Sequence, residues 1–371
     1  MKKNHILTSI TLTLLLSFML LSCNADATAG LFRQISESKA PVGIVYKQIV
    51  GLDTTAPRTL YYLTSEGLFS TDGTSSTKLV ANEEGNIIQS AYVDTTGGEV
   101  VFQTNDGTKK LYRYNISTEL ITELSGFTTN ERVLLLANGL VLTKDATSTY
   151  KLFDYDVPAS EIATTGAVNG YDLVSVLQLS GKEHMGVSAT NPLLITLVNT
   201  SGDYKHFYVD DPTTGDTSVI EMDESTKTYR FASMAAINSD VYLLTTDGKL
   251  YAASTPSAAT FNLMHDTNES YNKHAFMYAT SDDTTTRLIT KPEGINEPLY
   301  VINFPDTTVT DTASVTYSTI REGYGVYLDA AEIVDSYEKS ANVLLVATLE
   351  NGMYEIDIAG DTSSETEAYT L

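Results

Sequence analysis

The chain has 371 residues, 47 of them acidic and 23 basic, and its formal net charge is −24 at pH 7. This excess of carboxylates argues against nucleic-acid binding, because cationic side chains must replace the counterions around phosphate. It also argues against adsorption onto anionic lipid headgroups. The composition includes 23 Tyr and 11 Phe but no Trp. Together with frequent Val, Ile, Leu and Thr, it favours β-strands.

The N-terminal segment has the layout of a secretory signal rather than a spanning helix. Lys2 and Lys3 precede an apolar stretch, Ile6 to Leu21, that ends in Leu20-Leu21-Ser22-Cys23. These four residues resemble the lipobox of bacterial lipoproteins. The resemblance implies a signal peptide over residues 1–22 and lipidation of Cys23 with acyl chains such as palmitate. The alternative is an ordinary cleaved signal with a chance cysteine near its end.

Residues 23–40 comprise this cysteine and a small, polar stretch that we expect to be a flexible tether. Cys23 is the only cysteine, so once it is acylated no disulfide is possible. No second apolar run approaches the length of a spanning helix. We therefore expect residues 41–371 to form the folded domain and the acyl chains alone to contact the membrane.

From about Pro41 a repeated pattern begins. In its clearest copies, Leu60–Ser70 and Val241–Tyr251, an apolar strand ends in Thr-x-Glu-Gly or Thr-x-Asp-Gly and an aromatic residue follows. Glycine after an acidic or amide residue suits a tight hairpin, because both turn positions need positive φ. Seven turn glycines, about 48 residues apart on average, mark the copies: Gly67, Gly107, Gly139, Gly202, Gly248, Gly294 and Gly352.

A period in the forties with four short strands per repeat is typical of a β-propeller. We therefore predict an all-β propeller of seven blades, each of four antiparallel strands. In the fifth blade the strands are expected at Phe231–Ile237, Val241–Thr245, Lys249–Ala253 and Phe261–Met264. Glu367–Leu371 is either the outermost strand of the last blade or a strand that pairs elsewhere to close the ring. A pair of β-sandwiches is the competing architecture, although sandwiches do not require the repeated aromatic after glycine.

Two stretches, Leu60–Val80 and Leu111–Leu124, resemble the degenerate repeats of bacterial extracytoplasmic propellers. A lipobox followed by a propeller is similar in architecture to the BamB-like outer-membrane lipoproteins, whose blades carry a tryptophan docking motif that this chain lacks. Asn24 is not the Asp that marks inner-membrane retention in enteric bacteria. The resemblance thus implies a location in the cell envelope at the outer membrane, on its periplasmic or its surface face.

No motif predicts a catalytic residue, a cofactor or a metal site. The chain has no HExxH motif, no GxSxG elbow and no phosphate-binding loop, and its histidines are scattered: His5, His184, His206, His265 and His274. Carboxylates cluster in loops where they could bind calcium, but turn formation by Asp and Thr explains them better: Asp53–Thr55, Asp210–Asp216 and Ser281–Thr286, with Asp-Thr-Thr again at Asp94 and Asp306. Three sequons, at Asn115, Asn199 and Asn268, carry little weight in a bacterial chain.

Tyrosines are the remaining candidates for recognition, because a ring exposed on a propeller rim can stack on sugars or grip a peptide. The residues concerned include Tyr61, Tyr62, Tyr112, Tyr114 and Tyr155, and we expect most of them to pack between blades. The leading hypothesis is a non-enzymatic, lipid-anchored scaffold for a protein partner in the envelope. The alternatives are a glycan or small-ligand binder at the central channel and, less favoured, a propeller hydrolase or lyase, which needs carboxylates or histidines to converge.

Overall fold

A computed structural model describes residues 44–53, 58–105, 110–126, 132–178 apart from 138, 192–209, 219–222 and 228–253 apart from 238, 239 and 248, and further strands between 261 and 369. The signal, Cys23 and the tether lie outside these residues. The stretch Val45–Leu371 is one compact unit. Within the described part of the chain, every regular element is a β-strand, and no helix is long and apolar enough to cross a membrane.

The described strands form seven four-stranded sheets, here called blades, each built from four consecutive strands. Blade 1 has β1 (Tyr46–Asp53), β2 (Thr59–Thr64), β3 (Gly67–Thr71) and β4 (Ser76–Ala81), and blade 2 has β5 (Ile88–Asp94), β6 (Glu99–Thr104), β7 (Leu111–Asn115) and β8 (Ile121–Leu124). Blade 3 has β9 (Arg132–Ala137), β10 (Leu140–Lys144), β11 (Thr149–Asp154) and β12 (Glu161–Ala167), and blade 4 has β13 (Tyr171–Gln178), β14 (Leu193–Asn199), β15 (Tyr204–Val209) and β16 (Val219–Glu221).

The last three blades follow the same plan. Blade 5 has β17 (Phe231–Ile237), β18 (Asp240–Thr245), β19 (Lys249–Ala253) and β20 (Asn262–Asp266). Blade 6 has β21 (His274–Ser281), β22 (Thr286–Pro292), β23 (Leu299–Phe304) and β24 (Thr316–Ile320). Blade 7 has β25 (Ile333–Ser340), β26 (Val343–Thr348), β27 (Met353–Asp357) and β28 (Ser364–Tyr369). Neighbouring strands of each blade are antiparallel.

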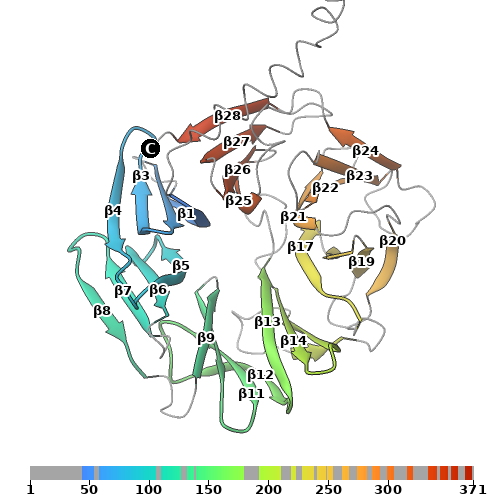
Figure 1. Cartoon of the computed structure of the whole chain (residues 1–371), viewed down its shortest axis with the longest axis horizontal. Helices are drawn as coiled ribbons and strands as arrows, with labels where there is room; N and C mark the ends of the chain where they lie inside the picture. The colour runs from blue at the N-terminus through green and yellow to red at the C-terminus, as the bar shows by residue number, and fades with distance from the viewer. Residues whose placement is uncertain are drawn as a thin grey trace, which may run out of the picture. The chain divides into compact units, whose positions relative to one another are not determined.

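The first strand of each blade is the innermost. Each of these strands contacts the next one in the order β1, β5, β9, β13, β17, β21 and β25, and β25 contacts β1. Figure 1 shows these strands around a common centre. The predicted all-β propeller is therefore confirmed, and the pair of sandwiches is wrong. Because β28 is the outermost strand of blade 7, the ring closes between whole blades rather than through a shared strand.

The core lies between adjacent blades. The middle strands are covered on both faces, so they are apolar along most of their length. In β6, for example, all six residues are buried. One cluster joins blades 3 and 4 and another joins blades 4 and 5. Each fully buried large side chain contributes about 1.5 to 3 kcal/mol, so stacking of blades stabilises the ring.

A buried threonine at the end of the second strand explains the Thr-x-acid-Gly pattern. The Thr64 hydroxyl donates to the Gly67 carbonyl (3.4 Å) and accepts from the Glu66 N–H (3.0 Å). The threonines that end the second strand of three other blades are also buried: Thr104, Thr245 and Thr348. At Gly67 φ is +138°, and a Cβ would come within 2.1 Å of the Val80 carbonyl oxygen. The hairpin thus requires glycine at this position.

One of the seven turn glycines was assigned to the wrong hairpin. Gly139 (φ +76°) joins the first and second strands of blade 3, whereas the turn between the second and third strands spans 145–148. Glycine suits position 139 because its φ is positive, and an added Cβ would also lie 3.0 Å from the Tyr92 ring. The misassignment accounts for the uneven spacing on either side of Gly139. Gly202 and Gly352 do lie in the predicted hairpins, whereas Gly107, Gly248 and Gly294 are outside the described residues.

Polar side chains bridge neighbouring innermost strands. The Gln48 amide donates to the Ala91 carbonyl (2.9 Å) and accepts from the Ala91 N–H (3.0 Å), which joins blade 1 to blade 2. At the corresponding point of blade 7, the Asp335 carboxylate accepts from the Ile49 N–H (2.7 Å). The first and last blades are therefore joined by the same kind of contact that joins consecutive blades.

Candidate binding surface

The predicted site residues do not assemble into a metal or catalytic centre in the described part of the chain. No group of three or more potential metal ligands occurs among the described residues. His206 is buried within blade 4, and His265 and His274 lie in β20 and β21, where only the backbone is described. His184 and the loop 210–216 are outside the described residues, as are Asp282 and Asp283.

The turn interpretation of Asp-Thr-Thr holds where it can be followed. The Asp94 carboxylate accepts from the backbone N–H groups of Thr96 and Gly97, both at 2.9 Å. Asp72 does the same for Thr74 and Ser75, both at 2.8 Å, and these hydrogen bonds lower its pKa to about 2. The carboxylates therefore serve the backbone of their own turns. Asp53 ends β1, and Asp306 is outside the described residues.

The tyrosines named from the sequence pack between blades, as expected. Tyr61, Tyr62, Tyr114 and Tyr155 are buried. Tyr112 is half-buried, and its ring stacks on Phe102 with centroids 5.5 Å apart. Four of these rings are therefore buried, and the fifth, Tyr112, is partly covered by Phe102.

One group of charged residues converges between blades 2 and 3. We call it the ionic cluster: Asp94, Glu99, Arg113, Tyr155 and Asp156. The Tyr155 hydroxyl donates to Asp94 (2.7 Å), and Arg113 contacts both Glu99 (3.1 Å) and Asp156 (2.7 Å). Burial, followed by the hydrogen bond to Asp94, raises the pKa of Tyr155. Each group is held by another, so the cluster links two blades and offers no poised acid or base.

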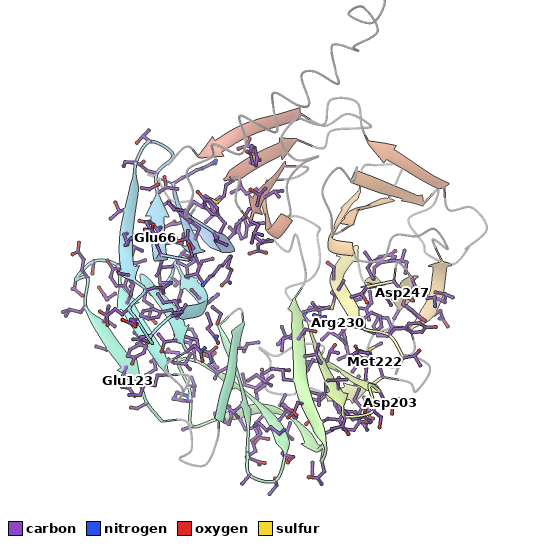
Figure 2. All side chains as sticks on the ribbon, viewed as in Figure 1. Glu66, Glu123, Asp203, Met222, Arg230 and Asp247 are labelled. Atoms are coloured by element: carbon purple, nitrogen blue, oxygen red, sulfur yellow. The ribbon has the colours of Figure 1, made fainter. Side chains whose placement is uncertain are left out.

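A second polar group lies where strands of blades 3, 4 and 5 begin or end. We call it the tyrosine–lysine surface: Lys144, Tyr171, Asn199, Tyr204, Lys205, Tyr229 and Lys249. All seven side chains are half-buried. Exposed charged residues surround them, and Figure 2 shows Asp203, Arg230 and Asp247 together on this side of the ring.

The blade 4 part of this surface centres on Tyr171, the first residue of β13. Lys144 donates from blade 3 to the Tyr171 carbonyl (3.1 Å) and to Asp172 (3.0 Å). The Asn199 amide donates to the Tyr171 hydroxyl (3.3 Å), and the Lys205 ammonium lies 5.6 Å from the ring centroid. The ring of Tyr171 is thus held by residues of its own blade, and its backbone carbonyl by Lys144 of blade 3.

The blade 5 part centres on Tyr229. Its carbonyl accepts from Nε2 of His206 (2.9 Å), so Nε2 carries the proton and, in the neutral ring, Nδ1 accepts from the Thr196 hydroxyl (3.0 Å). The Lys249 ammonium donates to the Tyr229 hydroxyl (3.0 Å) and lies 4.2 Å from the ring centroid. Tyr204 stacks on His206 with centroids 6.1 Å apart. The buried histidine therefore connects the blade 4 and blade 5 tyrosines.

The charges of the tyrosine–lysine surface are arranged to remain ionised. The hydrogen bond between Lys249 and Tyr229 raises the pKa of Lys249 and lowers the pKa of Tyr229. Burial alone would lower the pKa of Lys144, but its interactions with Asp172 and Tyr150 together outweigh burial and the net shift is upward. Beneath them, burial raises the pKa of Tyr251 to about 12. At neutral pH the surface carries fixed ammonium groups beside tyrosine rings and carboxylates.

The tyrosines of this surface were not singled out from the sequence. The pattern did contain a signal, because a lysine near the hairpin recurs at Lys144, Lys205 and Lys249. The tyrosine that each lysine contacts lies in a neighbouring blade or near the start of a strand at least 20 residues away in the sequence. Sequence spacing alone therefore could not predict the pairs.

No family model matches the sequence, and no characterised protein matches it either. Solved structures do share the fold. KlAtg21 in "Complex of KlAtg21 with coiled-coil of AgAtg16" has a TM-score of 0.54 and 12% identity, over 88% of this chain and 100% of that chain. The structure "YCF48 bound to D1 peptide" has a TM-score of 0.51 and 10% identity, over 84% of this chain and 92% of that chain. A chain of "Crystal Structure of Mitotic Checkpoint Complex" has a TM-score of 0.50 and 9% identity, over 89% of this chain and 92% of that chain. At these identities the comparison establishes the β-propeller fold and nothing finer.

Proposed function

We propose that this chain is a lipid-anchored β-propeller of the cell envelope that binds a protein partner through the tyrosine–lysine surface. The observation that carries the proposal is the continuity of half-exposed tyrosines and lysines across three blades. Aromatic side chains are enriched where proteins bind one another. Here the rings are held by neighbours before any partner arrives, which limits the ordering entropy that binding costs.

Two propellers of similar fold support a polypeptide as the ligand. One is YCF48, whose structure is described as bound to D1 peptide, and the other is KlAtg21, described in complex with the coiled coil of AgAtg16. Their identity to this chain is 10% and 12%, so the position and mode of binding do not transfer. They support only the use of this scaffold for polypeptide recognition.

The anchor and the location rest on the N-terminal sequence. Cys23 closes the lipobox-like run, Asn24 follows it, and the stretch to residue 40 is small and polar. Acyl chains on Cys23 would hold the propeller at the outer membrane, while the net charge of −24 would keep the domain itself off anionic headgroups. The partner is then expected to be another envelope protein.

Glycan binding and catalysis are less well supported. The rings of Tyr171 and Tyr229 already carry lysine ammonium groups, which a stacked sugar would have to displace. The surface also extends outward from innermost strand β13 to the third strands β15 and β19, rather than collecting at the channel. A hydrolase or lyase needs acidic and basic side chains that lie close together, and among the described residues the ionic cluster is the candidate. The raised pKa of Tyr155 makes its phenol a weak proton donor.

The test is site-specific photo-cross-linking in cells, with the photoreactive residue in place of Tyr204 and, as a matched control, in place of Tyr112 in blade 2. We expect one discrete product of the Tyr204 probe that disappears in a Tyr171→Ala/Tyr229→Ala background. It should also diminish in the Cys23→Ser form, which loses the anchor. Equal products from both probe positions, or none from the Tyr204 probe, would contradict the proposal.

A further inference from the structure

A second surface lies on blade 2, on the other side of the ring from Asp203 and Arg230 (Figure 2). Five large apolar side chains of the described residues are exposed, and two of them, Leu120 and Ile121, are adjacent at the start of β8. Leu120 is 63% exposed and Ile121 is 48% exposed. Because β8 is the outermost strand of blade 2, these side chains stand at an open sheet edge.

The backbone of β8 also has a free edge. The Asn115 N–H donates to the Leu120 carbonyl (3.0 Å) where β7 turns into β8. Hydrogen-bonded pairs alternate along an antiparallel ladder, so Thr122 and Leu124 bond to β7. The N–H and C=O groups of Ile121 and Glu123 therefore point away from the blade. Such a row of unpaired groups is a template for another strand.

The outermost strand of blade 1 shows how such an edge is usually blunted. In β4 the exposed run is Ser76, Thr77 and Lys78, which is polar and contains a lysine. The outermost strand of blade 3, β12, instead contacts the outermost strand of blade 4. Strand β8 has no lysine within it, and among the described residues it makes no close contact with the outermost strand of blade 1 or of blade 3. Its edge is thus open to a partner.

The charges around β8 select the partner. Glu119, Glu123 and Asp156 are exposed. The nearby cations are already paired, since Lys110 contacts Glu123 (3.1 Å) and Arg113 contacts Glu99 and Asp156. A second copy of this chain would bring another net charge of −24 to the same edge. An approaching strand is favoured when it carries lysine or arginine.

We propose that β8 is a docking edge to which an extended, basic segment of another protein adds as a fifth strand of blade 2. Its backbone pairs with Ile121 and Glu123, and its apolar side chains cover Leu120 and Ile121. Its basic side chains face Glu119 and Glu123. This interaction is separate from the tyrosine–lysine surface and does not depend on it.

The test uses a labelled peptide of alternating Val and Lys, with alternating Val and Glu as the charge-reversed control, titrated against the full-length protein in detergent. Binding is followed by fluorescence anisotropy, and the amides of Ile121 and Glu123 by hydrogen exchange. We expect the Val–Lys peptide to bind and to protect these two amides. The Val–Glu peptide should not bind.

The variants separate the edge from the fold. Glu123→Pro removes one outward N–H without touching the ladder to β7, so we expect at least about tenfold weaker binding. The matched control is Ser76→Pro, whose N–H points outward from β4 because Asp72 and Ser75 form the adjoining hydrogen-bonded pair, and which should leave binding unchanged. If Glu123→Pro does not fold, Ile121→Thr keeps the strand and should still weaken binding. No binding of the Val–Lys peptide, equal binding of the Val–Glu peptide, or dimerisation of the chain through β8 would overturn the proposal.

Discussion

The ionic cluster and the tyrosine–lysine surface both place tyrosines beside cations, but their tyrosines differ in burial. Between blades 2 and 3, Tyr155 is buried and the Glu99 side chain is 9% exposed, so phenol, guanidinium and carboxylates satisfy one another. Across blades 3 to 5, tyrosines and lysines are half-buried, and the Asp172 side chain is 89% exposed. The two groups therefore differ in the burial of their tyrosines and not of their cations, since the Arg113 side chain is 30% exposed and that of Lys249 is 20% exposed.

The difference has an energetic consequence. A charge removed from water needs its partner, and loss of the partner leaves it uncompensated. An ion pair in contact with water is worth little, because solvent and salt screen it. Substitutions in the ionic cluster should therefore affect stability first, whereas substitutions in the tyrosine–lysine surface should affect binding first.

The largest effect is expected for Arg113→Met, which removes the cation beside buried Glu99. Arg113 is itself 30% exposed, so the full cost of a broken buried pair is reduced to about 2 to 3 kcal/mol. Urea denaturation measures the free energy of unfolding. Lys205→Met is the control, because its pair with Glu221 is solvent-exposed and should cost less than about 1 kcal/mol. Equal losses for the two variants would contradict the comparison.

His206→Phe should have the next largest effect. The phenyl ring keeps the shape that packs against Phe231 (centroids 4.7 Å apart), but it removes the hydrogen bonds to Thr196 and to the Tyr229 carbonyl. The expected loss is about 1 to 2 kcal/mol. Tyr204→Phe, at a half-exposed position, should stay within about 0.5 kcal/mol. If His206→Phe is as stable as the parent, the histidine does not join blades 4 and 5.

Much of the fold followed from the sequence because its signal is local. The Thr-x-acid-Gly pattern predicted the hairpins of blades 1 and 5, and the strands of blade 5 fell within a few residues of their predicted bounds. Gly139 was assigned to the wrong turn because the first hairpin of blade 3 also has a glycine with positive φ. A glycine in a turn indicates a positive φ, but it does not indicate which hairpin of the blade the turn belongs to.

The candidate site was less predictable because its contacts are not local. Lys144 meets Tyr171 across 27 residues, and His206 meets Tyr229 across 23. These pairs exist because the ends of strands from adjacent blades meet on one side of the ring. The sequence predicted the tyrosines that fill the core, such as Tyr62, since they lie within the strand pattern. It did not predict those at strand entries, where the pattern carries no such constraint.

A smaller, pH-dependent effect is expected for Tyr155→Phe. Burial would raise the pKa of Asp94, but hydrogen bonds from Gly97, Tyr155 and Thr96 outweigh it and lower that pKa. Ionised Asp94 thus stabilises the fold above its unfolded-state pKa of about 3.9, and this stability is lost as pH falls through the lowered pKa. The raised pKa of Tyr155 acts at the other end: its contribution is present below pH about 10 and is lost as pH rises further.

Loss of the Tyr155 hydroxyl should cost about 1 kcal/mol at neutral pH and flatten both limbs of the stability profile. The measurement is the free energy of unfolding at a series of pH values from acid to alkaline. Tyr112→Phe, a half-buried tyrosine of the same blade region, serves as the control and should keep both limbs. An unchanged profile for Tyr155→Phe would mean that Asp94 is held by its own turn alone.

The smallest change in stability is expected for Lys249→Gln, and it sharpens the comparison most. The lowered pKa of Tyr229 has its main cause in the hydrogen bond from Lys249, so this variant should return that pKa toward about 10 and alter stability by less than about 0.5 kcal/mol. NMR of labelled tyrosine, assigned with Tyr229→Phe, follows the titration. If the same variant weakens the Tyr204 cross-link, the Lys249 ammonium contributes to partner binding rather than to folding stability. If Lys249→Gln destabilises the protein as much as Arg113→Met does, the tyrosine–lysine surface stabilises the fold as the ionic cluster does, and the comparison fails.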